Sequence, residues 1–249
     1  LNLKLAWPSG EWGSLPVEGG VAVAFRRDIA SAPDPAAREA ELQEAPDAAR
    51  KGNQVVKFNA QGEVLMVLGT PGTTGEPPAA LNQPNDVIVA PNGDILVSEG
   101  HSAQGPHGRI SRFSSDGTFL GSFGEFGPGP GQFRIPHAMA FDSGGRLFVA
   151  DRGNNRIQIF DADGNFLEQW DDVVRPGSMV MLNDIVYVIE SGPQGGISIF
   201  DLDHNLLSSW RSNEPQEGSI IGGHGICVDL DGNIYVTEIG NGARVTKFQ

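Results

Sequence analysis

Residues 136–170 decide the fold, and they read PHAMAFDSGGRLFVADRGNNRIQIFDADGNFLEQW. The stretch contains four short runs in which apolar and polar residues alternate, and an alternation of period two is typical of half-buried β-strands. A Gly turn follows the first run, an acid ends the second, a Phe ends the third, and an Asp-Gly turn leads into the fourth. Because Asp-Gly is a common hairpin dipeptide, we expect one antiparallel sheet of four strands here.

The same pattern recurs along the chain. It covers residues 84–124 and 176–210, and residues 223–248 show it without a fourth strand, while residues 54–69 supply the last two strands of another unit. A Phe ends the third strand of each unit. These residues are Phe58, Phe113, Phe160, Phe200 and Phe248. A spacing of 40 to 55 residues, with four short strands per unit, is typical of β-propeller blades.

We therefore predict an all-β fold, with residues 1–249 forming a single β-propeller domain. Five blades are expected, or six if residues 25–53 contain further strands. The last unit lacks a fourth strand and residues 1–7 alternate apolar and polar, so we expect the N-terminal strand to complete the final blade and close the ring. Residues 28–53 are rich in Ala and Glu without a strand pattern, which indicates an irregular insertion within the first blade.

Composition narrows the classes of partner. The formal net charge is −14, so phosphate backbones and anionic membranes are repelled, and we expect neither nucleic acid nor a membrane as a partner.

The single cysteine, Cys227, rules out an internal disulfide and is expected to be a buried, inert thiol. The chain begins with Leu1 rather than Met, which indicates that a segment was removed, by signal cleavage or by design. A periplasmic or secreted location and a monomeric state are the corresponding expectations.

Two of the five histidines occupy equivalent positions, at the start of predicted inner strands. His137 lies in Ile-Pro-His-Ala and His224 in Gly-Gly-His-Gly. The start of an inner strand faces the central channel of a propeller, so side chains from different blades converge there. Neutral imidazole is a good zinc ligand, and catalytic zinc sites usually take three protein ligands plus water. The pair therefore indicates a metal site, with hydrogen-bonded channel histidines as the alternative.

The repeat units resemble NHL repeats, and three segments resemble the peptidyl-α-hydroxyglycine α-amidating lyase group more narrowly. These segments are LNQPNDVIVAPNGDILVSEGH, QFRIPHAMAFDSGGRLFVADRGNNRIQ and GGHGICVDLDGNIYVTE. The resemblance implies a propeller whose central channel holds a zinc on three histidines and cleaves a carbinolamide into an amide and glyoxylate. His137 and His224 match two of those histidines. The chain looks about one blade short of the family pattern, because the Pro-His motif expected just before Gln54 is absent.

The third zinc donor must then come from elsewhere, and His101 is the candidate. It follows a second strand at the position where the family places a catalytic tyrosine, so it supplies either the third ligand or the general base. Arg26 or Arg27 resembles the arginine with which the family binds the substrate carboxylate, and an ion pair that anchors the insertion is the alternative. The family also binds calcium, for which backbone carbonyls near Asn85 and Asp86 are suitable oxygen donors.

Acids recur at the ends of the second strands. They are Glu99, Asp151, Glu190 and Glu238. Either they attract a cation to one mouth of the channel, or they accept backbone N–H groups of the loops.

The sequence thus predicts a zinc-dependent lyase-like enzyme with a small-molecule or peptide-like substrate in the central channel. The alternative is a non-catalytic NHL propeller that binds a small ligand or a protein on one face. A propeller lactonase with calcium has less support, and no G-x-S-x-G motif favours serine hydrolysis.

Overall fold

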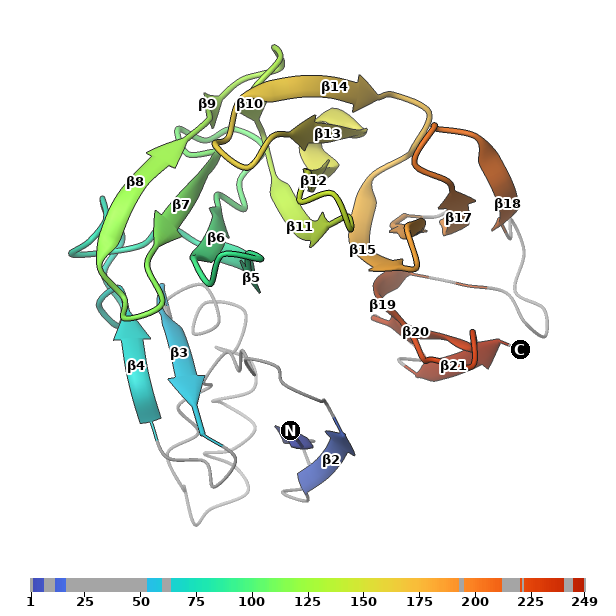
Figure 1. The fold of residues 1–249 in the computed structure, drawn as a ribbon, viewed down its shortest axis with the longest axis horizontal. Coiled ribbons are helices and arrows are strands. Elements are labelled where there is room, and N and C mark those ends of the chain that lie inside the picture. Colours follow the sequence, from blue (N-terminus) through green and yellow to red (C-terminus); the bar gives the residue numbers. More distant parts are fainter. Residues whose placement is uncertain are drawn as a thin grey trace, which may run out of the picture.

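A computed structural model shows antiparallel sheets arranged in an arc around a central space (Figure 1). It describes residues 2–6, 12–16, 53–59, 64–192, 195–211, 220, 222–239 and 244–248. Within these residues the single short helix is the 3-10 turn η1 (Arg152–Asn154), and strands and loops make up the rest. The predicted all-β propeller is therefore confirmed. None of the described residues form a helix long and apolar enough to cross a membrane.

Three four-stranded sheets form complete blades, and in each the strands pair in chain order. The first contains β5 (Pro84–Val89), β6 (Ile95–Glu99), β7 (Arg109–Phe113) and β8 (Phe119–Phe123). The second contains β11 (Pro136–Phe141), β12 (Leu147–Asp151), β13 (Arg156–Phe160) and β14 (Phe166–Trp170). The third contains β15 (Pro176–Leu182), β16 (Ile185–Glu190), β17 (Gly196–Phe200) and β18 (Leu206–Arg211).

The remaining sheets are smaller. The last blade has three strands, β19 (Gly223–Val228), β20 (Ile234–Glu238) and β21 (Val245–Phe248). At the other end of the arc is a hairpin of β3 (Val55–Phe58) and β4 (Val64–Leu68). A short parallel pair, β9 (Glu125–Phe126) and β10 (Gln132–Phe133), links the first two complete blades.

The described residues thus contain four blades of three or four strands, where five were expected. The β3–β4 hairpin takes the place of the fifth unit in the arc (Figure 1). The sequence predicts that this unit covers residues 16–69, and its inner strand, expected at residues 19–25, lies outside the described residues. So does the predicted insertion at 28–53, apart from Asn53.

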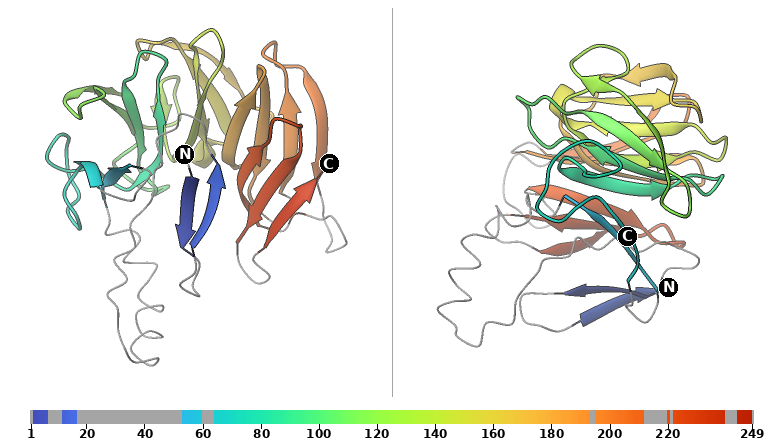
Figure 2. Two further views of the ribbon diagram at one scale, coloured as in Figure 1. Left: turned by 60° about the horizontal axis from the view of Figure 1, so that its bottom comes forward. Right: turned by 90° about the vertical axis from the view of Figure 1, so that its left-hand side faces the viewer.

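The N-terminal strand does not complete the last blade. Instead β1 (Asn2–Ala6) pairs with β2 (Trp12–Pro16) in an antiparallel hairpin, and β21 ends its own sheet. Figure 2 shows the β1–β2 hairpin as a separate pair of strands. The predicted closure of the ring by residues 1–7 is therefore wrong for this structure. An alternating strand pairs with any suitable partner, and closing a short loop costs less entropy than closing a loop that spans the whole chain.

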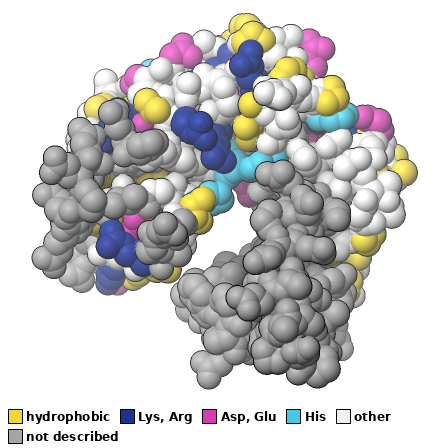
Figure 3. Space-filling model, turned by 180° about the vertical axis from the view of Figure 1, so that it is seen from behind, with side chains coloured by type: hydrophobic (Ala, Val, Ile, Leu, Met, Phe, Trp, Pro, Cys, Tyr) yellow, Lys and Arg dark blue, Asp and Glu magenta, His cyan; other side chains and the backbone are white. Residues whose placement is uncertain are grey.

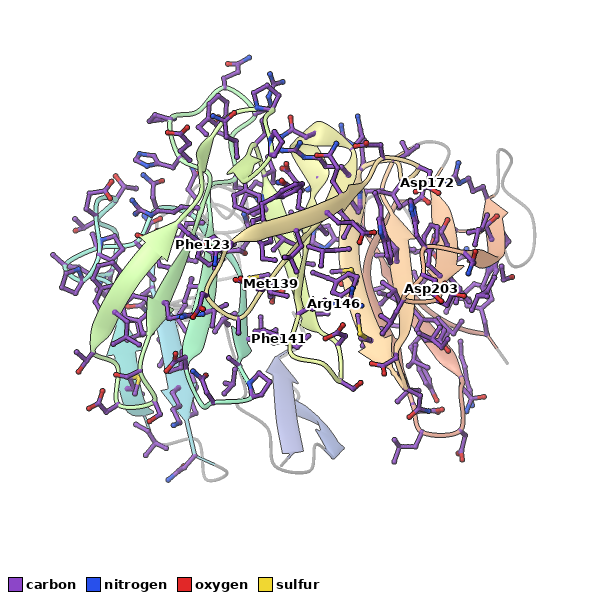
Figure 4. The ribbon with its side chains drawn as sticks, turned by 45° about the horizontal axis from the view of Figure 1, so that its top comes forward. Phe123, Met139, Phe141, Arg146, Asp172 and Asp203 are labelled. Carbon is purple, nitrogen blue, oxygen red and sulfur yellow. The ribbon has the colours of Figure 1, made fainter. Side chains whose placement is uncertain are left out.

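Apolar side chains form four buried clusters, one between each pair of neighbouring units. Between the first two complete blades, for example, Phe133 and Met139 are buried together with Phe123 packed against them. Figure 4 labels Phe123 and Met139, which approach this interface from facing sheets. Each strand has one set of side chains for each neighbouring blade, so the alternation read from the sequence becomes blade-to-blade packing.

Cys227 is exposed, so the expectation of a buried thiol is wrong. Its neighbour Ile226 belongs to the cluster between the last two blades. Side chains alternate along β19, and Cys227 consequently faces away from that cluster.

The acids at the ends of the second strands are buried, and each pairs with a guanidinium group. The N–O distances are 3.1 Å for Glu99–Arg109, 3.0 Å for Asp151–Arg156, 2.8 Å for Glu190–Arg211 and 2.7 Å for Glu238–Arg244. The acids also accept backbone N–H groups from the loop before the inner strand, as Glu99 does from Asn82 at 2.6 Å and Asp151 from Arg134 at 2.9 Å. Of the two roles predicted for these acids, the structure therefore favours the structural one.

Candidate functional site

The inner strand of each of the four blades carries a β-bulge at its second residue. There the register with the neighbouring strand shifts by one residue. The bulged residues are Asn85, His137, Gly177 and His224. A bulge leaves one residue unpaired and re-aims its side chain, which explains why positions equivalent in sequence converge at the inner edge of the arc.

Three histidine rings meet at this inner edge. The ring centroids of His101 and His137 are 5.2 Å apart, and those of His137 and His224 are also 5.2 Å apart. His137 and His224 come from β11 and β19, and His101 follows β6, so three blades contribute. In Figure 3 histidine side chains gather here, with Lys and Arg side chains directly beside them. The structure thus brings together all three histidines that the sequence singled out.

The Nδ1 atoms of two of these histidines have hydrogen-bond partners. His137 is 8% exposed, and its Nδ1 lies 2.5 Å from the carbonyl oxygen of Gly177. Because a carbonyl can only accept, Nδ1 carries the proton and Nε2 the lone pair. His101 Nδ1 lies 2.6 Å from the side-chain oxygen of Asn85. Histidines that bind metals usually hold their second nitrogen in this way, on a carbonyl, a carboxylate or water.

The surroundings favour the neutral form of the two bulged histidines. Burial is the main cause that lowers the pKa of His137 to about 3, and the positive charge of Arg152 and the two other imidazoles add to it. Burial, followed by the charge of Arg152, also lowers the pKa of His224. Neutral imidazole is the form that binds a metal, so no proton has to be displaced from these two side chains at pH 7.

Arg152 stands beside the histidines and was not found from the sequence. It follows Asp151 directly, where the other blades have Gly100, Ser191 and Ile239. Its Nε is buried with no hydrogen-bond partner among the described residues, and burial and the charge of Arg175 lower its pKa. A buried N–H group without an acceptor is costly, and a planar guanidinium group beside the histidines is suited to pairing with a carboxylate. The signal in the sequence was a charged residue at a position where the other repeats have none.

The donor set fits zinc by its chemistry. Imidazole rings around a tetrahedral zinc, with Zn–N about 2.0–2.1 Å, have centroids about 5 Å apart, as in both ring pairs here. In the part of the chain that the structure describes, no three His, Cys, Asp or Glu side chains already place their donor atoms around one point.

Two further predictions stay predictions. Arg26 and Arg27 lie outside the described residues. Calcium near Asn85 and Asp86 is likewise untested, although the Asp86 carboxylate is already engaged by the backbone N–H groups of Val87 and Met139, both at 2.8 Å.

Known proteins share both the repeat and the fold. Residues 133–160 match the family model of the NHL repeat. NHL repeat-containing protein 3 of Homo sapiens is 39% identical over 144 residues, which are 55% of this chain and 41% of that protein. Peptidyl-glycine alpha-amidating monooxygenase B of Xenopus laevis is 33% identical over 205 residues, which are 75% of this chain and 23% of that protein. Among solved structures, a catalytically inactive virginiamycin B lyase from Staphylococcus aureus with quinupristin has a TM-score of 0.57 at 16% identity, covering 99% of this chain and 76% of that one.

The chain thus folds as a β-propeller and matches the NHL repeat over residues 133–160. It is related to amidating lyase-like proteins, as the sequence resemblance implied, and also to NHL repeat-containing protein 3. It spans less than half the length of the two relatives described above. The likeness to the solved lyase structure shows the fold alone.

Proposed function

We propose that this propeller is a metal-dependent lyase-like enzyme that cleaves the C–N bond of a carbinolamide, such as a peptidyl-α-hydroxyglycine. The observation that carries the proposal is the cluster of His101, His137 and His224, whose rings from three blades meet 5.2 Å apart in two successive pairs. The engaged Nδ1 atoms of His101 and His137 and the neighbouring Arg152 support it.

The proposed reaction transfers one proton and involves no net oxidation or reduction. The hydroxyl group of the carbinolamide loses its proton, its oxygen forms a C=O bond, the C–N bond breaks, and the departing amide nitrogen takes up a proton. The products are an amide and glyoxylate. A bound zinc would supply Lewis-acid polarisation of the hydroxyl oxygen and lower its pKa.

Separate side chains of the protein bind the metal, bind the substrate carboxylate and transfer the proton. His137 and His224 would hold the metal through nitrogens that are neutral at pH 7. The guanidinium of Arg152 binds the substrate carboxylate, for which its planar fork is suited. His101 is either the third metal donor or the group that carries the proton from the hydroxyl oxygen to the amide nitrogen.

Metal analysis with activity measurement tests this assignment. Protein purified without chelator should carry one zinc per chain and release glyoxylate from a peptidyl-α-hydroxyglycine. His137→Ala and His224→Ala should each lose the metal and the activity. His101→Ala should lose the metal if His101 is a ligand, but keep the metal and lose activity if it carries the proton.

His204→Ala is the matched control for these variants. His204 lies in the turn between β17 and β18, and its ring stacks on Trp170 with centroids 4.4 Å apart. This variant should keep both the metal and the activity. A wild-type protein that takes up no stoichiometric zinc would contradict the proposal.

The second candidate function is a non-catalytic propeller that binds a ligand through the same cluster. The 39% identity to NHL repeat-containing protein 3 over 55% of this chain supports it. This alternative predicts that the wild-type protein binds a small carboxylate such as glyoxylate but shows no turnover. Arg152→Ala should weaken this binding.

A further inference from the structure

The Asn85 side chain makes three contacts at the edge of the histidine cluster. Its Nδ2 donates to the carbonyl oxygens of Gly100 at 2.8 Å and Pro136 at 2.9 Å. Its Oδ1 lies 2.6 Å from Nδ1 of His101. Gly100 directly precedes His101 and Pro136 directly precedes His137, so one amide is bonded to the backbone next to two of the three histidines.

The two carbonyls determine how this amide is oriented. Carbonyl oxygens only accept hydrogen bonds, so the NH₂ group of Asn85 must face Gly100 and Pro136, and its oxygen must face His101. The His101 nitrogen in contact with that oxygen must then be the donor. His101 is therefore held as the Nδ1–H tautomer, with the lone pair on Nε2.

We propose that Asn85 is the positioning residue of the histidine cluster. It selects the tautomer of His101, and it ties the segment before His101 to the segment before His137 across the boundary between two blades. The part of this inference that concerns the metal rests on the proposed function, but the selection of the tautomer does not. Either proposed role of His101, as metal donor or as proton carrier, requires the lone pair on Nε2.

The surrounding backbone supports this role. Gly100 has a φ of +107°, in the left-handed region that favours glycine, and a Cβ there would lie 2.1 Å from the carbonyl oxygen of His107. Only glycine therefore allows the sharp exit from β6 that turns His101 back toward Asn85. The His101 backbone N–H also donates to the side-chain oxygen of Gln83 at 3.1 Å, which holds the residue at both its backbone and its ring.

The tautomer is measurable in metal-free protein. In wild-type protein labelled with ¹⁵N, at pH 8, above the ordinary histidine pKa of about 6.5, the ring signals of His101 should show the proton on Nδ1. Asn85→Leu has a similar size but no polar atoms, and it should shift His101 toward the Nε2–H form. Asn85→Asp keeps an acceptor and should retain the Nδ1–H form even if the chain is less stable. A wild-type His101 in the Nε2–H form, or an unchanged tautomer in Asn85→Leu, would overturn the inference.

Zinc binding provides the second measurement. Asn85→Leu should weaken zinc binding about 10- to 100-fold, the usual effect of losing a group that orients a ligand. Asn165→Leu is the control, because the Asn165 side chain only serves a surface turn, through Asp161, and it should leave zinc affinity unchanged. If wild-type protein binds no zinc while the tautomer responds as expected, the proposed function fails and the role of Asn85 stands. If zinc binds but Asn85→Leu changes neither tautomer nor affinity, the role of Asn85 fails instead.

Discussion

Two neighbouring blades, β11–β14 and β15–β18, share the same strand arrangement but differ at the inner edge of the arc. Both end their second strand in a buried acid paired with a guanidinium group, Asp151 with Arg156 and Glu190 with Arg211. At the bulge, the first blade has His137 and the second has Gly177. At this edge the β11–β14 blade has an imidazole side chain, whereas the β15–β18 blade has only backbone.

The difference shows that the two blades depend on each other. The bare carbonyl of Gly177 accepts the Nδ1 proton of His137, and a Cβ at Gly177 would lie 2.1 Å from Ser191 Oγ. In both blades a guanidinium group pairs with the buried acid, but the arginine that carries it lies on different strands. Gly196 occupies the position that Arg156 has in the first blade, and Arg211 reaches the acid from the fourth strand instead. The position of the charge in space is kept, although its position in the sequence is not.

The largest expected effect is a loss in the free energy of unfolding, and it differs between the two ion pairs. Arg156 is 4% exposed and Arg211 is 40% exposed. Arg156→Met leaves Asp151 buried without its cation and should cost about 3–5 kcal/mol. Arg211→Met also leaves a buried acid, Glu190, but it removes a cation that is 40% exposed, so it should cost less, about 1–3 kcal/mol. Urea unfolding at pH 7 measures both, and equal losses would mean that the two ion pairs are not distinguished by burial.

The second-largest expected effect is a loss of stability at low pH, which His137 causes. The pKa of His137 is lowered to about 3 in the folded protein from 6.5, so the unfolded chain takes up the proton first as the pH falls. The stability that neutral His137 contributes is complete above pH 6.5 and is lost as the pH falls toward 3. In metal-free protein this should cost about 3 kcal/mol between pH 6.5 and 4.

His137→Gln has no such titration, so its free energy of unfolding should fall less over the same range. The difference between the two proteins at pH 8 gives the constant part of the substitution. Parallel curves for wild type and variant would show that His137 is not held neutral by the fold.

The smallest effect tests the bare position in the second blade. Gly177→Ala places its Cβ against Ser191 Oγ, which then has to leave its 2.9 Å bond to the carbonyl of Gly223. We expect a loss of about 1–2 kcal/mol. On a Ser191→Ala background the same change should cost less, because the obstructing atom is gone. A thermal-unfolding double-mutant cycle measures the coupling, and a coupling of zero would contradict this account of the contact.

Most of the architecture was predictable, because it depends on local signals. The alternation of period two, the Asp-Gly turns and the recurring Phe at strand ends predicted the strands of 84–124, 136–170 and 176–210 as the structure has them. The closing strand was not predictable in this way. Residues 2–6 have the pattern of a strand, but a pattern does not identify the partner, and the structure pairs them with residues 12–16.

The candidate site was predictable in part. His137 and His224 were found because equivalent repeat positions converge, and His101 because of the family resemblance. Arg152 was missed because it has no counterpart in the other repeats. Asn85 was considered only for its carbonyl, because the contacts of its amide depend on Pro136 in the next blade.

The order of residues along the chain was thus sufficient for everything carried by short-range periodicity: the strands, the turns and the equivalence of the repeats. It was insufficient for the ring tautomers, for the neutral state of His137 and for the Nε of Arg152, which has no hydrogen-bond partner among the described residues. Each of these depends on which groups approach from another blade. Hydrogen-bond geometry and desolvation act across a few ångströms of space, and residues 137 and 177 are that close only after the blades have packed.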